Sequence, residues 1–388
     1  GVTLDGEGHN IYQAVRSFGN LAVSDSVIKN MVYPGYQGTG LWVDAADATI
    51  SNNSFSGIGR MGVALFAGTS TVQNNTFIGN GEGDSVEYGV EVEEGADVTI
   101  SGNTFAEYQG IASSDGSGSG AILVSSYFGP NSFATITNNT ISNSLYGVLI
   151  GYLDDDSSGA TIQNNTFQYN DYHIYTVNQD STDITIGENT YIPNSVTILE
   201  QPGSVFATIQ SAIDAAEDNQ TVFVPAGTYV ENIVIDKPLT LRGTDKDSVI
   251  LLPASIGTYC ASGSLCDESS NVIMVEADNV TIHDLTIDGD NPDLDNPRDD
   301  ALVNGANIDA RNGIVTNHVK NSNITGLEVY NTVVKNIFLR GIYMSTNGEF
   351  DFHDNIVTNV AGDSASIGLF AYGASGKFTN NTVSLAND

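Results

Sequence analysis

Ala48-Thr-Ile-Ser-Asn-Asn-Ser-Phe55 decides the fold, because close copies of this phrase recur along the chain. Thr-Ile is typical of a short strand, Asn-Asn of a tight corner, and the final Phe of the start of the next strand. Asn suits such a corner because it tolerates the left-handed backbone better than other non-glycine residues. Further copies begin at Ser70, Val98, Ala134, Ala160, Asp183, Phe350 and Gly376.

The spacing of these copies predicts a solenoid. The second corner Asn falls at positions 53, 75, 103, 139, 165 and 189, and periods of roughly 20 to 50 residues are typical of solenoid repeats. A third strand follows each corner, as in residues 146–150. Three short strands per turn predict an all-β, parallel β-helix whose coils stack roughly 4.8 Å apart. The corner asparagines should form one ladder, and inward side chains should form another at Phe55, Phe77, Phe105, Ile141, Phe167 and Tyr191.

Five corner phrases also match the N-glycosylation sequon, beginning at Asn52, Asn74, Asn138, Asn164 and Asn380. We favour a structural role for them, because a stacked corner Asn would leave no room for a glycan.

The charge balance excludes several classes of partner. The chain has 388 residues with 47 acidic and 12 basic side chains, a formal net charge of −35, and no Lys or Arg between Arg60 and Lys237. Such a surface repels nucleic acids and anionic lipids. No apolar run approaches the ~20 residues that span a bilayer. We therefore expect no nucleic-acid partner and no membrane insertion.

A different period appears in the middle of the chain. Ile209, Ala212, Ile213 and Ala216 are spaced as on one face of a helix, which predicts a short helix over residues 207–217. Ser204 or Thr208 could cap its start. Strand-like sequence resumes at residue 221.

This run, with the phrase Ala226-Gly-Thr-Tyr-Val-Glu231, resembles the opening of right-handed parallel β-helix proteins of the pectate-lyase-like superfamily. That superfamily includes the repeats called carbohydrate-binding and sugar-hydrolase domains. The resemblance implies a helix that covers the open N-terminal end of a solenoid, and it implies a fold rather than an activity.

The internal helix divides the predicted organisation into two parts. Residues 1–200 read as the later coils of one parallel β-helix, and residues 201–388 as the cap helix and first coils of a second. The strand at Val2 and the corner at Asn380 both belong to predicted coils that have no capping helix beside them in the sequence. Uncovered coil edges recruit further strands, so we expect other copies of the chain as end-to-end partners, in a longer repeat protein or a filament. The alternative is a fragment whose two ends face solvent.

The third strands offer an outward face, which carries the cleft in enzymes of the superfamily. Glu91 and Glu93 lie two residues apart on this face, so their carboxylates could be about 6–7 Å apart, near the range of inverting glycosidases. A solvated strand face is the simpler interpretation. The absence of Arg and Lys from residues 61–236 opposes a polyuronate lyase there. The apolar members of the face should contact sugar rings, loops or a partner molecule: Trp42, Phe66, Leu123, Leu149 and Tyr175.

Three loops carry further candidates. An acidic loop suits Ca²⁺, the only cofactor we consider, although a solvated loop explains it equally well; its candidate ligands are Asp288, Asp290, Asp293 and Asp295. Residues 154–156 read as a plain exposed acidic loop. Cys260 and Cys266 should form a disulfide in an oxidising compartment, and two unpaired thiols are the alternative.

These features favour a non-enzymatic, extracellular or cell-surface β-solenoid of a bacterium or archaeon, with a structural or adhesive role. The alternative is a carbohydrate-binding module, or a polysaccharide-active enzyme such as a glycoside hydrolase, with its cleft on the outward third-strand face. A deep groove with converging carboxylates and a basic group would favour the alternative. Short loops and large contacts between chains would favour the structural role.

Overall fold

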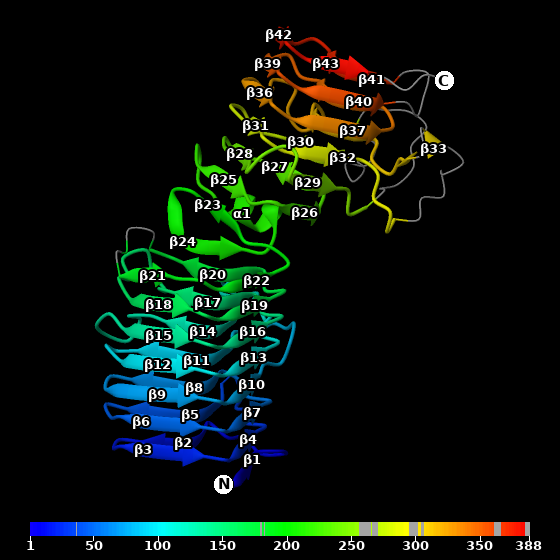
Figure 1. The fold of residues 1–388 in the computed structure, drawn as a ribbon. Helices are drawn as coiled ribbons and strands as arrows, with labels where there is room; N and C mark the ends of the chain where they lie inside the picture. Colours follow the sequence, from blue (N-terminus) through cyan, green and yellow to red (C-terminus); the bar gives the residue numbers. More distant parts are fainter. Residues whose placement is uncertain are drawn as a thin grey trace. The chain divides into compact units, whose positions relative to one another are not determined.

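The computed structural model describes residues 1–35, 37–178, 181, 183–255, 265, 271–294, 302–303, 306–360 and 366–384. The chain forms two compact units, each of which is a parallel β-helix with three strands per coil (Figure 1). The first unit comprises Gly1–Ser195 with Gln201–Ala207, and the second comprises Val196–Glu200 with Thr208–Asp388. The predicted all-β parallel β-helix is confirmed.

In the first unit, each coil contributes one strand before the Asn corner, one after it, and a third strand that closes the coil. The entering sheet contains β3 (Leu21–Ser24), β6 (Ala48–Ser51), β9 (Thr69–Gln73), β12 (Asp97–Ser101), β15 (Phe133–Thr137), β18 (Gly159–Gln163) and β21 (Ile184–Ile186). The leaving sheet contains β1 (Thr3–Asp5), β4 (Val27–Lys29), β7 (Ser54–Ser56), β10 (Thr76–Ile78), β13 (Thr104–Ala106), β16 (Thr140–Ser142), β19 (Thr166–Gln168) and β22 (Thr190–Ile192).

The third sheet carries the candidate site. It contains β2 (Gln13–Ser17), β5 (Thr39–Asp44), β8 (Met61–Phe66), β11 (Tyr88–Glu93), β14 (Gly120–Val124), β17 (Tyr146–Ile150) and β20 (Tyr172–Thr176). The antiparallel strand β24 (Gln201–Phe206) pairs with β20 and covers the last coil of this unit, with Phe206 buried.

The inward aromatic ladder is confirmed. Phe77 pairs in register with Phe55 on one side and Phe105 on the other. The ring centroids are 4.6 and 4.8 Å apart, and the rings are nearly parallel. All three side chains are fully buried, whereas the neighbouring Thr76 is exposed. The alternation inferred from the repeat therefore places the correct side chains in the core.

The ladder of corner asparagines is built from the second Asn of each corner. The Oδ1 atom of Asn103 accepts hydrogen bonds from the backbone N and the Nδ2 of Asn75, at 2.9 and 3.0 Å. Asn103 in turn donates from the same two groups to Oδ1 of Asn139, at 2.9 and 3.0 Å. The pattern repeats from Asn53 through Asn189. Each of these amides satisfies backbone groups that a tight corner would otherwise leave unpaired.

The first Asn of the corner has a different environment. Asn52, Asn74, Asn138 and Asn164 adopt positive φ angles between 54° and 58° and are exposed. The sequon asparagines are therefore not the stacked ones, and the lack of room that we held against glycosylation does not apply to them.

Replacing Asn103 by Asp tests the ladder. An ionised Asp still accepts from Asn75 but loses the Nδ2 hydrogen bonds to Val72 O and Asn139 Oδ1. Because it is also a buried charge, we expect the free energy of unfolding to fall by about 2–3 kcal/mol. The exposed Asn74→Asp should change it by less than about 0.5 kcal/mol in urea titrations. Similar losses in both variants would show that the ladder contributes no special stability.

The second unit begins with the predicted helix, α1 (Ile209–Ala215), which is two residues shorter at each end than residues 207–217. Thr208 caps its start by accepting a hydrogen bond from Ser211 N. The two carboxylate oxygens of Glu231 accept from Ile209 N and Gln210 N at 2.9 and 3.0 Å, which satisfies two further free donors of the first turn. Within the described part of the chain, no helix is both long and apolar enough to traverse a lipid bilayer.

The coils of this unit repeat the same three-strand plan. The entering strands are β25 (Thr221–Val224), β28 (Thr240–Gly243), β31 (Thr281–His283), β36 (Leu327–Tyr330), β39 (Glu349–His353) and β42 (Ser375–Thr379), and β23 (Val196–Ile198) pairs antiparallel with β25. The leaving strands are β26 (Gly227–Val230), β29 (Val249–Leu252), β32 (Thr286–Asp288), β37 (Val333–Ile337), β40 (Ile356–Val360) and β43 (Thr382–Ser384). The third strands are β27 (Ile233–Ile235), β30 (Asn271–Val275), β35 (Asn312–Thr316), β38 (Arg340–Met344) and β41 (Ile367–Ala371). The short strands β33 (Leu302–Val303) and β34 (Ala306–Asn307) pair antiparallel with each other.

Candidate functional site

The outward column predicted on the third sheet of the first unit is present in register. The paired positions run from Trp42 through Ala64, Glu91, Leu123 and Leu149 to Tyr175. Phe66 and Glu93 pair in the adjacent column. The repeat therefore placed these side chains on one face, although it gave no information about what covers that face.

The chain's own loops cover much of this face. Leu123 and Leu149 pack with Val86 and Tyr88 in a small apolar cluster, against which Tyr175 lies half-buried. A second cluster contains Met61, Ala64 and Phe66, with Trp42 packed against it. Leu123 and Leu149 thus pack with Val86 from a loop, and Phe66 contacts Phe128 from another loop, with ring centroids 5.5 Å apart. Contact of the apolar side chains with a sugar or partner stays a prediction.

Asp156 holds two of the covering loops together. Its Oδ2 accepts from Ser126 N at 2.8 Å and Tyr152 N at 3.0 Å, and its Oδ1 accepts from Ser158 N at 2.9 Å. The side chain is buried. The expectation of a plain exposed loop at residues 154–156 is therefore wrong for this residue, which links residues 125–132 to residues 151–158.

Glu91 and Glu93 are buried, so the solvated face expected for them is not found. The carboxylate of Glu93 accepts from the Ser125 hydroxyl and from Phe128 N, which fixes it to the loop. Glu91 Oε2 has no hydrogen-bond partner. Burial raises the pKa of Glu91 to about 8, with a smaller contribution from the nearby Glu93, and raises the pKa of Glu93 to about 7. The two carboxyls on this strand thus have different surroundings: the loop binds the carboxylate of Glu93, whereas Oε2 of Glu91 has no hydrogen-bond partner.

A third carboxyl near this face is also bound by a loop. Both oxygens of Glu87 accept from Asn80, one from its backbone N and one from its Nδ2, each at 2.6 Å. Burial raises the pKa of Glu87 to about 7. Glu87 therefore closes the loop at residues 79–87, and Glu91 is the carboxyl among the three with an oxygen left for a ligand.

Arg60 brings a positive charge to this face. Its Nη1 donates to Val86 O at 2.9 Å, and its guanidinium lies 5.4 Å from the centroid of the Tyr88 ring. It also opposes the rise in the pKa of Glu91. Sequence reasoning missed Arg60 because it lies one residue before the Arg- and Lys-free stretch. The pairing of Met61 with Tyr88 explains how it reaches the carboxyls of the next coil.

An aromatic array extends across several coils beside Arg60. We use this name for Trp42, Phe66, Phe128, Tyr127 and Tyr152. Trp42 and Phe66 are stacked with centroids 4.5 Å apart, and Phe66 meets Phe128 edge to face at 5.5 Å. Tyr127 contacts both Phe128 and Tyr152, at 4.9 and 4.7 Å. Tyr127 and Phe128 are about half exposed, so part of the array is available at the surface.

Two hollows adjoin this array. The Arg60 hollow, of about 260 Å³, is lined by polar residues that include Asp84, Ser113 and Asp115, with Tyr152 on one side. The Glu91 cavity, of about 90 Å³, is lined by Glu91, Glu93, Tyr88 and the array residues Tyr127, Phe128 and Tyr152. Arg60 and Tyr152 line both hollows. Hydrogen bonds from Ser113 N and Oγ to Asp84, at 2.6 and 2.8 Å, fix one wall.

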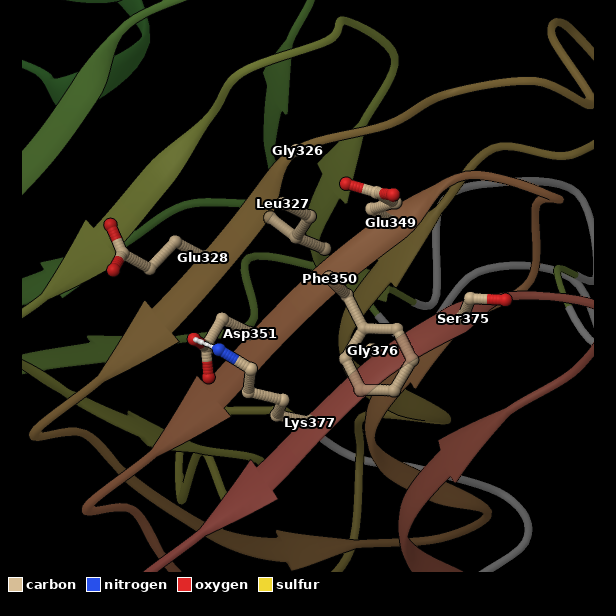
Figure 2. A pocket seen from close by; sticks show the side chains of 9 residues that line it. All are labelled: Gly326, Leu327, Glu328, Glu349, Phe350, Asp351, Ser375, Gly376 and Lys377. Atoms are coloured by element: carbon tan, nitrogen blue, oxygen red, sulfur yellow. Dashed lines mark ion pairs between the residues drawn. The ribbon is translucent and has the colours of Figure 1, made fainter.

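The second unit carries a wider, open hollow of about 450 Å³ (Figure 2). Glu328, Asp351 and Lys377 occupy one row across β36, β39 and β42. Lys377 Nζ lies 3.9 Å from Asp351 Oδ2. Phe350 lies against Gly376, where a Cβ atom would be 2.6 Å from its ring. This hollow is an acidic depression in which two carboxylates already have partners, because Glu328 Oε1 in turn lies 3.5 Å from His353 Nε2.

The loop candidates are only partly within the described residues. Asp288 Oδ2 forms an ion pair with Lys335 at 2.9 Å, and its Oδ1 accepts from Asn336 Nδ2 at 2.6 Å. No set of three or more potential metal-binding side chains is present in the described ranges, which include Asp290 and Asp293 but not Asp295. Cys260 and Cys266 also lie outside the described residues. Calcium binding and the disulfide stay predictions.

Comparison with known proteins identifies the fold family. A family model described as "Right handed beta helix region" matches residues 7–190 and 84–222, which together span more than half of the chain. Among solved structures, the chain is similar to the PL6 family alginate lyase AlyGC, with 14% identity over 98% of this chain and 66% of that one, and a TM-score of 0.28. An arginine-to-alanine mutant of the same lyase gives 13% identity, 98% and 74% coverage, and a TM-score of 0.28. A likeness this distant says nothing of this chain's activity, and no curated protein matches the sequence. The chain belongs to the family of right-handed parallel β-helix proteins.

Proposed function

We propose that the first unit is a saccharide-binding, adhesive β-solenoid of an extracellular surface, and that its site is the Arg60 hollow with the aromatic array. The proposal combines the adhesive role with the carbohydrate-binding alternative from the sequence. The observation that carries it is the junction of partly exposed rings and a polar hollow on one face.

The aromatic array suits the apolar face of a sugar ring, and the polar Arg60 hollow suits its hydroxyl groups. Exposed rings such as Tyr127 and Phe128 offer amphipathic, rigid contact area at low entropic cost. Ser113, Asp115 and the guanidinium of Arg60 offer donors and acceptors for hydroxyl groups. The volume of about 260 Å³ is below the range of roughly 300–1,000 Å³ for drug-sized ligands. The hollow therefore suits one sugar unit, with neighbouring units resting on the array.

Hydrolysis is not part of the proposal. An inverting or retaining glycosidase needs two carboxyl groups that face the same bond. Glu93 is held by Ser125 and Phe128, and Asp84 is held by Ser113. Of the described buried carboxyls Glu87, Glu91 and Glu93, Glu91 is the one with an oxygen that has no hydrogen-bond partner, and a single such carboxyl suits a binding role better than hydrolysis.

Saccharide binding can be measured by calorimetric titration of the whole chain with neutral, amino and acidic oligosaccharides. We expect dissociation constants on the order of 0.1–1 mM, weakened at least tenfold by Tyr152→Ala and by Ser113→Ala. The control is Thr99→Ala, which removes an exposed side chain on β12, away from the third sheet. The proposal fails if no saccharide binds, or if the control weakens binding as much as Tyr152→Ala does.

A further inference from the structure

The Glu91 cavity has walls that suit a cation. Tyr127 lies 87° from the plane of Phe128 and 66° from the plane of Tyr152, so the three rings form adjoining walls rather than a stack. Tyr88 lines the same cavity. Aromatic faces carry a negative quadrupole and attract an organic cation within about 6 Å of the ring centroid. The chain already uses this interaction, because the guanidinium of Arg60 lies over Tyr88.

One buried oxygen of the cavity lining, Oε2 of Glu91, has no hydrogen-bond partner among the described residues. The Glu91 side chain is 3% exposed. Buried polar atoms without partners are rare, and each costs about 1–3 kcal/mol. Protein groups have already taken the oxygens of the neighbouring Glu93. A guest with an N–H group would complete the hydrogen bonding of Glu91.

The charges around the cavity also favour a cation. Glu91 and Glu93 line it together with a single Arg60, and Asp156 lies near enough to affect Glu93. The raised pKa values of Glu91 and Glu93, about 8 and about 7, mean that this lining becomes net negative only when both carboxyls ionise, which occurs at higher pH or when a cation binds. The whole chain, at −35, attracts cations from solution.

We propose that the Glu91 cavity binds an organic ammonium group, which donates an N–H hydrogen bond to Glu91 Oε2 inside the aromatic walls. This inference rests on the proposed function, and it identifies the saccharide of the Arg60 hollow as an amino sugar with a free ammonium group. Arg60 and Tyr152 line both hollows, so the two adjoin each other, and in this proposal one ligand places its ring in the Arg60 hollow and its ammonium in the cavity.

Binding should release a proton. Burial raises the pKa of Glu91 to about 8, so this carboxyl is mostly protonated at pH 7 in the free protein. A bound ammonium favours the carboxylate, and the proton leaves to solvent while the ligand keeps its own charge. The groups that face Glu91 and influence this step are Glu93, Arg60 and Tyr88, with Tyr152 also on the cavity wall.

Titration with glucosamine, N-acetylglucosamine and glucose tests the proposal. We expect glucosamine to bind at least tenfold more tightly than the other two at pH 7. Buffers of different ionisation enthalpy should report the release of up to one proton, and affinity should rise between pH 5 and pH 7, where glucosamine keeps its ammonium charge while ionisation of Glu91 becomes less costly. Methylammonium alone should bind more weakly at the same site. Glu91→Gln should abolish both the preference and the proton release, whereas Thr99→Ala should keep them.

The outcomes separate the two proposals. Equal affinity for the three sugars overturns the ammonium site and leaves the saccharide-binding function standing. Binding of methylammonium that depends on Glu91, with no saccharide bound, supports the cavity and overturns the saccharide-binding function. Binding of acetate or sulfate in place of methylammonium would make this an anion site formed by Arg60 and overturn the inference. Tyr127→Ala, at a half-exposed residue, provides a second variant should Glu91→Gln fail to fold.

Discussion

Phe77→Ala is expected to lower the free energy of unfolding by about 3–5 kcal/mol, the usual cost of deleting a buried aromatic ring. The ring is fully buried and stacks between Phe55 and Phe105. Its loss leaves a cavity between two rings that the paired strands on either side keep apart, so the site cannot collapse easily. Urea titration followed by near-ultraviolet circular dichroism measures the change.

The matched control is Thr76→Ala, one residue earlier on the same strand and exposed. It should cost less than about 0.5 kcal/mol. If the two variants lost similar stability, the inward and outward assignments along β10 would be reversed, and the outward face that carries the candidate site would be misassigned with them.

The pH dependence of stability should change strongly when Glu91 is replaced by Gln. The pKa of Glu91 rises from 4.5 to about 8 on folding, so between these pH values the folded chain holds a proton that the unfolded chain releases. Stability therefore falls as pH increases across this window. The shift corresponds to roughly 3–5 kcal/mol, and the wild type should lose that much more stability than Glu91→Gln between pH 5 and pH 9.

Comparing the two pH slopes removes any constant cost of burying the Gln amide. Glu87 remains in both proteins, so its own raised pKa contributes equally to each slope, whereas the contribution of Glu93 changes by its interaction with the charge of Glu91. Urea titrations at pH 5, 7 and 9 provide the measurement. Parallel pH profiles for wild type and variant would mean that solvent reaches Glu91 in the folded protein, and the ammonium site would lose its desolvated carboxyl.

The repeat made the coils predictable because it is a local pattern with a structural cause. Each Thr-Ile-x-Asn-Asn phrase specifies a strand, a left-handed corner and the next strand, so register follows from counting. That counting placed Trp42, Glu91 and Leu123 in one outward column, as found. It also placed Phe77 in the core. These positions depend only on neighbours within one coil and on the stacking of coils.

The environment of the site was not predictable in the same way. It depends on residues 79–87, 107–119, 125–132 and 151–158, which follow no repeat and fold against one another. Burial of Glu91, and hence the direction of its pKa shift, results from how these loops pack. Asp156 looked like part of a solvated acidic run, yet it accepts three backbone hydrogen bonds. Only the position of Arg60 beside the next coil could have been found, by extending the register one residue before Met61.

The Asn ladder makes the spacing of the coils independent of the length and sequence of the loops. Each rung from Asn53 to Asn165 gives the same two donors, a backbone N–H and an Nδ2, to the next rung. The rungs from Asn75 onward receive the same two from the rung before, whereas Asn53 receives one hydrogen bond, from the backbone N of Ser26. The rungs are nevertheless separated by intervals as different as 22 and 36 residues along the chain. We therefore expect that a whole coil can be duplicated or deleted between two corners. The corner asparagines on either side of the change would still find the same donors and acceptor in the next coil. The corner hydrogen bonds keep the spacing of the coils constant. The loops between the corners can therefore change in length and sequence, and so acquire new binding surfaces, without altering that spacing.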